Sequence, residues 1–151
     1  MVTHPQPERR VIDVLLVEDD PGDELMIREA FEHHDIRHAL HHVPDGVEAM
    51  RFLRQEDGYG ASPRPDLILL DLNLPRMDGR QVLREVKGDP ALRAIPIVVL
   101  TTSEADEDIL RSYELHANAY VTKPVDFDHF IEVVRMTDDF FVNVVKLPRR
   151  A

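Results

Sequence analysis

The stretch VIDVLLVEDD, residues 11–20, decides the fold class, because an almost wholly apolar, partly β-branched run ends abruptly in three acids. Such a short run is typical of a strand buried on both faces, as in a parallel sheet covered by helices. Similar runs occur at residues 67–70 and 97–100, and weaker ones at 38–43 and 119–122. We therefore expect five strands.

Amphipathic segments alternate with these strands. Apolar residues recur at helical spacing within residues 23–33 and 80–87, and again after Asp45, Ser103 and Asp126. Regular alternation of strands and helices predicts a parallel sheet with helices on both of its faces. The expected fold class is therefore α/β, with a (βα)5 doubly wound architecture. In such folds a ligand binds outside the carboxyl ends of the strands.

Length and composition narrow the function. The 151 residues suit a single domain, and 18 basic against 29 acidic residues give a net charge of −11. This acidity argues against direct contact with nucleic acid, whose affinity for proteins rests on Lys and Arg. The absence of cysteine removes disulfides and thiolate metal sites. With no apolar run long enough to span a bilayer and no secretion signal, we expect a soluble, cytoplasmic protein without membrane association.

Three segments fall outside the strand–helix alternation. Residues 1–10 are expected to be disordered, and residues 55–65 form a long loop rich in Gly and Pro. Residues 138–151 extend beyond the last expected helix and contain an apolar run at 140–145. The expected organisation is thus a disordered segment 1–10, one domain at 11–137 and a C-terminal extension at 138–151.

Chemically active side chains follow the strands. Glu18 and Asp19 come after the first strand, Asp71 after the third, Thr101 after the fourth and Lys123 after the fifth. Any one of these residues could follow a strand merely because a loop begins there. Together they place clustered carboxylates, which suit Mg²⁺, beside a lysine and a hydroxyl that suit an anion. The set is suited to phosphoryl transfer to a carboxylate.

These residues stand in motifs that resemble those of the receiver domains of bacterial two-component response regulators, over about residues 11–137. The motifs are LVEDDP at 16–21, LLDLNLPRMDG at 69–79, VLTTS at 99–103 and YVTKP at 120–124. The resemblance implies a flavodoxin-like fold with strand order 2-1-3-4-5. It also implies a role for each matching residue.

By this resemblance Asp71 is the phosphoacceptor. Glu18 and Asp19 form the acidic pair of a Mg²⁺ site, with Asp19 binding the ion directly and Glu18 acting through water. Asp71 shares the ion, and Asn73 contributes its backbone carbonyl. Asp20 is outside the implied ligand set.

The resemblance assigns the remaining residues to binding and switching. Thr101 would bind a phosphoryl oxygen, Lys123 would pair with the phosphate, and the Lys123–Pro124 peptide would be cis. Tyr120 resembles the switch aromatic that turns inward as Thr101 moves. The alternative for Tyr120 is an edge-strand aromatic packed against the last helix.

A narrower resemblance, carried by loops and a tail, is to the small regulators paired with bacterial phytochrome kinases. It rests on EDDPGD at 18–23, the 55–65 loop and FFVNVVKLP at 140–148. In the tail, two adjacent Phe residues cannot both face one core from a single helix. We expect a homodimer interface there, or else a tail folded back on its own domain. The interface candidates are Phe140, Phe141, Val142 and Val144.

The expected function is a stand-alone phosphoreceiver rather than an enzyme, with catalysis limited to its own aspartyl phosphorylation and dephosphorylation. A sensor histidine kinase would donate to Asp71, with a bacteriophytochrome as the specific candidate, and the output would pass through protein contacts. One alternative is a phosphorelay intermediate or phosphate sink. A haloacid-dehalogenase-like phosphatase also uses an aspartyl nucleophile, but it needs a second acid where this chain has Asn73. An unphosphorylated adaptor of the same fold would conflict with the complete set of Asp71, Thr101 and Lys123.

Overall fold

The computed structural model describes residues 11–33, 37–101, 117, 119–123 and 127–139. It contains one five-stranded parallel sheet in the order β2-β1-β3-β4-β5, so the expected α/β class and strand order are confirmed. The five strands lie where the apolar runs predicted them. They are β1 (Ile12–Val17), β2 (His38–Val43), β3 (Leu67–Asp71), β4 (Ile97–Thr101) and β5 (Ala119–Thr122).

Four helices are described: α1 (Pro21–His33), α2 (Gly46–Arg54), α3 (Gly79–Gly88) and α5 (Phe127–Asp139). The first begins two residues before the expected start, because proline is well suited to the first position of a helix. The last continues through Asp139, past the expected boundary at residue 137. The helix expected after Ser103 lies outside the described residues, as do segments 1–10 and 140–151.

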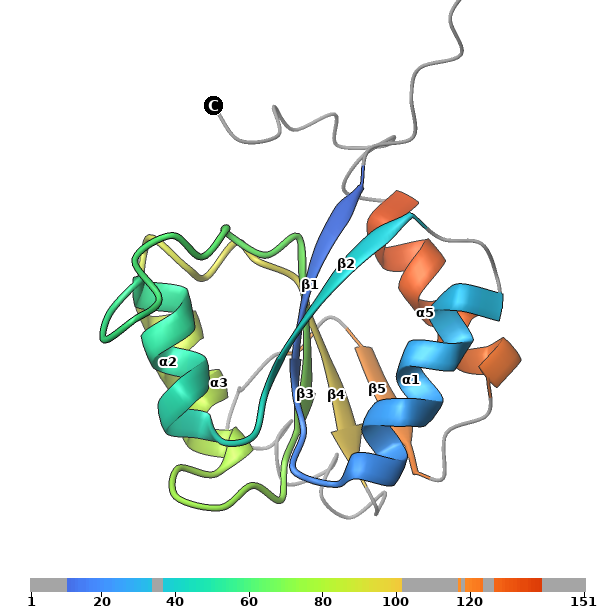
Figure 1. Cartoon of the computed structure of the whole chain (residues 1–151), viewed down its shortest axis with the longest axis horizontal. Helices are drawn as coiled ribbons and strands as arrows, with labels where there is room; N and C mark the ends of the chain where they lie inside the picture. The colour runs from blue at the N-terminus through green and yellow to red at the C-terminus, as the bar shows by residue number, and fades with distance from the viewer. Residues whose placement is uncertain (1–10, 34–36, 102–116, 118, 124–126, 140–151) are drawn as a thin grey trace, which may run out of the picture.

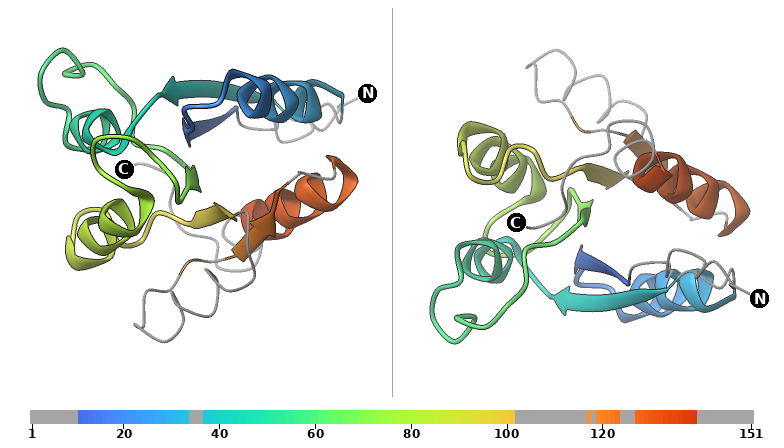
Figure 2. Two further views of the ribbon diagram at one scale, coloured as in Figure 1. Left: turned by 90° about the horizontal axis from the view of Figure 1, so that it is seen from below. Right: turned by 90° about the horizontal axis from the view of Figure 1, so that it is seen from above.

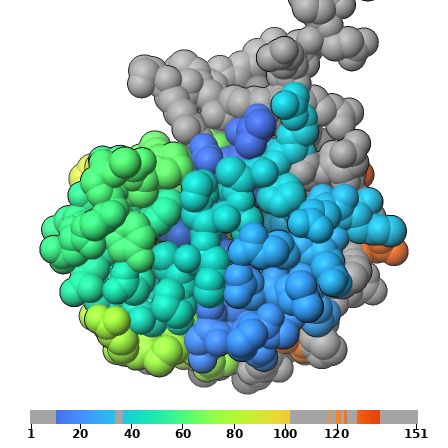
Figure 3. All heavy atoms as spheres, viewed as in Figure 1, coloured from blue at the N-terminus to red at the C-terminus, as the bar shows by residue number. Residues whose placement is uncertain are grey.

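The sheet is sandwiched between two helical layers. Helices α2 and α3 cover one face, and α1 and α5 cover the other (Figures 1 and 2). Because side chains alternate across a strand, each buried strand contributes to both cores. In β1, for example, Leu15 and Val17 face α2 and α3, whereas Val14 and Leu16 face α1 and α5. Strand β2 forms an edge of the sheet and lies between α2 and α1 on the near face (Figure 3).

Strand register brings the functional strand ends together. Val17 pairs with Leu70, so Glu18 and Asp71 follow at the same level of the sheet. Asp71 in turn pairs with Leu100, and Thr101 pairs with Thr122, directly before Lys123. All of these ends lie at the lower edge of the sheet in Figure 1, where α1 and α3 also begin. The chain order reverses between β1 and β3, which makes this edge the expected ligand position.

The long loop at 55–65 packs along α2, away from this edge (Figure 1). It leaves the helix through left-handed backbone at Gln55, Asp57 and Gly58. The hydroxyl of Tyr59 donates to Glu48, 2.7 Å away, and anchors the loop on α2. None of the helices that the structure describes has the length and apolar composition needed to cross a bilayer.

Candidate phosphoacceptor and metal site

Three carboxylates converge at the carboxyl edge. Glu18, Asp19 and Asp71 each offer an oxygen, and these oxygens all lie within 4.8 Å of one another. Glu18 is fully buried and Asp71 is 3% exposed, whereas Asp19 faces solvent. The sequence predicted these residues as neighbours, and the structure brings them together.

Lys123 completes the cluster. Its Nζ lies 2.8 Å from Glu18 Oε2 and 3.3 Å from Asp71 Oδ2. Its backbone N–H donates to the Thr101 carbonyl at 2.7 Å, which ties the end of β5 to the end of β4. The predicted lysine therefore lies within ion-pair distance of the predicted phosphoacceptor.

The charges of this cluster perturb one another. Burial raises the pKa of Glu18 to about 7; the hydrogen bond from Lys123 opposes this rise, and the negative charge of Asp71 adds to it. Burial alone would lower the pKa of Lys123, but hydrogen bonds to Asp23 and Glu18 and the charge of Asp71 outweigh it and raise that pKa. Lys123 thus stays charged, while Glu18 is placed to lose a proton when a cation binds.

The loop after β3 is held close to Asp71 by hydrogen bonds from two backbone N–H groups. The backbone N–H of Asn73 donates to Asp71 Oδ1 at 3.1 Å, so it holds one carboxylate oxygen while Lys123 lies near the other. The N–H of Gly79 donates to the Leu72 carbonyl at 3.0 Å and closes the loop. A Cβ on Gly79 would lie 2.3 Å from the backbone oxygen of Asp71, so glycine is required for this close approach.

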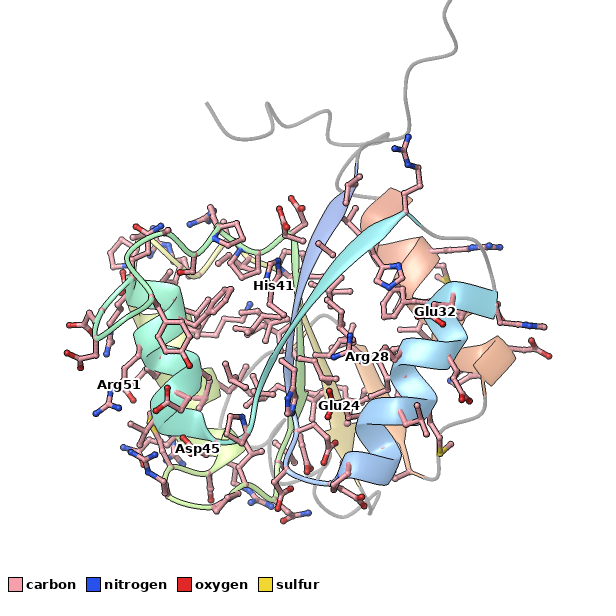
Figure 4. All side chains as sticks on the ribbon, in the orientation of Figure 1. Glu24, Arg28, Glu32, His41, Asp45 and Arg51 are labelled. Carbon is pink, nitrogen blue, oxygen red and sulfur yellow. The ribbon has the colours of Figure 1, made fainter. Side chains whose placement is uncertain are left out.

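The start of helix α2 contacts the same loop through Asp45. Asp45 caps this helix by accepting from the Glu48 N–H at 2.8 Å, and it also accepts from Arg76 Nη1 at 3.2 Å. Arg76 has a left-handed backbone with φ of 66°, which is unusual for a residue with a side chain. Figure 4 shows Asp45 at the start of α2, at the lower edge of the sheet. The Asp45–Arg76 pair therefore links the capped end of α2 to the phosphoacceptor loop.

Thr101 and Tyr120 lie in the two strands beyond β3. Thr101 is fully buried at the end of β4. Tyr120 is half-buried and packs against the core under α2 and α3, and its hydroxyl accepts from the Ala117 N–H at 3.5 Å. The alternative interpretation, in which Tyr120 packs against the last helix, is wrong. It is Val121, the next residue, that joins the α1 and α5 core, because adjacent strand residues point to opposite faces.

Two residues at the site were not predicted from the sequence. Asp23, in the first turn of α1, places Oδ2 2.8 Å from Lys123 Nζ. His42, at the end of β2, places Nε2 2.6 Å from the Glu18 carbonyl oxygen. A carbonyl only accepts, so Nε2 must carry the proton. Its Nδ1 lies 3.6 Å from Glu24, which also pairs with Arg28 on the next turn of α1 (Figure 4).

The arrangement suits a hard divalent cation. The converging ligands are carboxylate oxygens, the donor type that Mg²⁺ prefers. Glu18, Asp23 and Asp71 lie within 3.3 Å of the Lys123 ammonium, and Asp19 adds a fourth carboxylate beside Glu18 and Asp71. A divalent cation would therefore neutralise much of the remaining negative charge. Pro124 of the expected cis peptide and the interface candidates Phe140, Phe141, Val142 and Val144 lie outside the described residues.

Comparison with known proteins agrees with the motifs. Residues 14–135 match the response regulator receiver domain family. The response regulator Rcp1 of Synechocystis sp. is 47% identical over 135 residues, which cover 89% of this chain and 92% of Rcp1. The match is to a signalling family, which distinguishes the chain from the phosphatase alternative.

Two solved structures share the fold over nearly the whole chain. The phosphorylated cyanobacterial phytochrome response regulator RcpA matches with a TM-score of 0.76 at 45% identity, covering 92% of this chain and 99% of RcpA. The Mn²⁺-bound form of Rcp1 matches with a TM-score of 0.74 at 46% identity, covering 91% of this chain and 99% of Rcp1. The narrower resemblance to phytochrome response regulators is thereby confirmed. With the acidic cluster, the metal-bound relative also confirms the expectation of a divalent cation.

Proposed function

The chain belongs to the family of response regulator receiver domains, and from this premise we propose that Asp71 accepts a phosphoryl group from the histidine of a sensor kinase. The observation that carries the proposal is the convergence of three carboxylate oxygens within 4.8 Å, with Lys123 Nζ 3.3 Å from Asp71. Glu18, Asp19, Asp71 and the Asn73 carbonyl would hold Mg²⁺. When bound, this ion supplies charge neutralisation for the transferring phosphoryl group.

The residues of the site have separate tasks in this transfer. Asp71 attacks phosphorus through a carboxylate oxygen as the bond from phosphorus to the kinase imidazole nitrogen breaks. The Asn73 N–H and Lys123 Nζ hold the Asp71 oxygens in position, at 3.1 and 3.3 Å. Lys123 then pairs with the phosphoryl oxygens, and the Thr101 hydroxyl binds one of them. Catalysis by this chain is confined to forming and hydrolysing its own aspartyl phosphate.

The signal would leave through β4 and β5. Lys123 and Thr101 are joined through their backbones, so movement of either residue toward the phosphoryl group is transmitted to both strand ends. Tyr120, half-buried on β5, would change its packing as Thr101 moves. Phosphorylation would thus raise the population of a second conformation recognised by a protein partner or a His-containing phosphotransfer partner.

The test of this function is covalent labelling. Incubation with acetyl phosphate and Mg²⁺ should add the mass of one phosphate, and alkali should remove it. Asp71→Asn should abolish the gain. The control is Asp20→Asn, which removes an exposed carboxylate beside the acidic pair but outside the converging group. A gain that persists in Asp71→Asn, or no gain with acetyl phosphate or any kinase, would refute the assignment.

The partner proposed for this chain is a bacteriophytochrome histidine kinase, supported by its similarity to RcpA. A panel of purified kinases, phosphorylated with labelled ATP, should show the fastest transfer to this chain from phytochrome-type kinases. Equal or faster transfer from unrelated kinases would reject this pairing. If hydrolysis or transfer onward to a second His protein outpaces any change in partner binding, the chain acts as a phosphate sink or relay intermediate.

We further propose a homodimer that uses the extension at 138–151, with Phe140, Phe141, Val142 and Val144 at its interface. The support is the apolar sequence of this segment. Removal of residues 140–151 should lower the mass measured by light scattering from that of a dimer to that of a monomer. The same dimer mass in both proteins would exclude the segment from the interface.

A further inference from the structure

Lys123 is held by a carboxylate outside the converging group. Asp23 Oδ2 lies 2.8 Å from Lys123 Nζ, the same distance as Glu18 Oε2 and shorter than the 3.3 Å to Asp71 Oδ2. An ammonium has three N–H donors, so these three carboxylates can engage all of them. The Lys123 side chain is 11% exposed and that of Asp23 is 19% exposed, so solvent screens this ion pair weakly.

The position of Asp23 separates it from the metal ligands. It lies in the first turn of α1, where a negative charge is favoured by the helix dipole. It does not belong to the converging group of Glu18, Asp19 and Asp71. A cation bound by that group would neutralise part of the charge of Glu18 and Asp71. It would not bind Asp23, whose carboxylate would remain paired with Lys123.

Phosphorylation therefore creates a competition for the lysine. The phosphoryl oxygens on Asp71 need an N–H of Lys123, whereas Asp23 holds the same ammonium toward α1. We propose that Asp23 is a positioning residue that restrains Lys123 in the unphosphorylated state and opposes its engagement with the phosphoryl group. This inference rests on the function proposed above, because it assigns the residue that limits formation of the activated state.

The test uses beryllofluoride, which mimics the aspartyl phosphoryl group, and measures binding rather than turnover. The dissociation constants for Mg²⁺ alone and for beryllofluoride with saturating Mg²⁺ are determined by calorimetry or NMR. Asp23→Asn should tighten beryllofluoride binding by about tenfold, the effect of one charge-assisted hydrogen bond of about 1.4 kcal/mol. Its Mg²⁺ affinity should stay within about twofold, because Asp23 is not among the ligands. Tighter beryllofluoride binding with an unchanged Mg²⁺ affinity would not follow from a merely structural role of Asp23.

Three further variants make the result specific. Asp23→Glu keeps the charge and should restore binding toward that of the unmodified protein. Glu29→Gln removes the same charge from an exposed position on α1 and should leave beryllofluoride binding unchanged. In a Lys123→Gln background, Asp23→Asn should no longer tighten binding, because the restrained group is gone. Urea unfolding of each variant shows that it is folded under the binding conditions.

The outcomes separate the two proposals. If the unmodified protein fails to bind beryllofluoride, the proposed function and the role of Asp23 both fall. If it binds but Asp23→Asn binds equally or more weakly, only the role of Asp23 is refuted. A tightening that persists without Lys123 would also refute it, since the effect would then be a general one of charge.

Discussion

Substitution of Gly79 by alanine gives the sharpest test of how the site is positioned. A Cβ at this residue would lie 2.3 Å from the backbone oxygen of Asp71 and 2.7 Å from the Cα of Leu72. Ordinary contact begins near 3.4 Å, so the first atom pair must separate by 3.4 − 2.3 = 1.1 Å. Both contacted groups are backbone, so no side-chain rotation can relieve the overlap.

The displacement must fall on the phosphoacceptor loop. Helix α3 is anchored by three fully buried residues, Val82, Leu83 and Val86, and cannot retreat freely. Overpacking of this kind costs about 1–3 kcal/mol. A shift of roughly 1 Å is also large against the narrow range of about 2.0–2.1 Å over which oxygen ligands hold Mg²⁺. We expect Gly79→Ala to weaken Mg²⁺ binding at least tenfold, a loss of about 1.4 kcal/mol or more.

Gly88→Ala is the matched control. It lies at the other end of α3, and a Cβ there would meet nothing within 4 Å. Alanine is the better helix former, so Gly88→Ala should keep or raise stability by up to about 1 kcal/mol. Urea unfolding measures the free energy of both variants, and a Mg²⁺ titration measures binding. If Gly79→Ala loses stability but binds Mg²⁺ normally, the loop absorbs the overlap without moving Asp71, and the reasoning fails.

Three other outcomes follow from burial and charge. The pKa of Glu18 is raised from 4.5 to about 7 in the folded, metal-free protein, so the protonated carboxyl favours folding. This contribution to the free energy of unfolding is fully present below pH 4.5 and is lost as the pH rises through 7. Mg²⁺ must displace that proton, so calorimetry should show affinity rising about tenfold from pH 6 to pH 8; constant affinity would contradict the raised pKa. Asp45→Ala removes the cap of α2 and the partner of Arg76 and should cost about 1–2 kcal/mol in urea unfolding, whereas Asp45→Asn keeps the cap and should cost less. Phe130→Ala leaves a cavity beside Phe31 and should cost about 3–5 kcal/mol, while Met136→Ala, 66% exposed on the same helix, should change stability by less than about 0.5 kcal/mol.

The strands were predictable for a physical reason, whereas their order was implied by the resemblance to receiver domains. Strands β3 and β4 are buried along their whole length, and only unbroken apolar runs satisfy that environment. Parallel pairing then brings carboxyl ends to one edge, so Glu18, Asp71 and Lys123 could be assigned to one site from their sequence positions alone. The structure adds the distances and the burial.

The sequence left open which layer of helices Tyr120 faces. Side chains alternate between the two faces along β5, but that alternation does not say which face meets which helices. The left-handed backbone at Arg76 was equally unpredictable, because glycine is the residue that normally marks such a turn. Arg76 instead pairs with Asp45, and this tertiary contact supports a conformation that local preference disfavours.

The contact between Asp23 and Lys123 spans 100 residues, and neither local sequence suggests it. It depends on where α1 begins, because the helix turns its first acidic side chain toward the end of β5. The sequence shows an excess of acids at the carboxyl edge but not which of them pair with the single ammonium of Lys123. This pairing matters because the strand ends are fixed by backbone hydrogen bonds and cannot move apart to relieve repulsion between the carboxylates. The carboxylates that a cation does not neutralise must therefore compete for Lys123, and this competition, rather than the number of acids, determines how readily the lysine can turn to a phosphoryl group on Asp71.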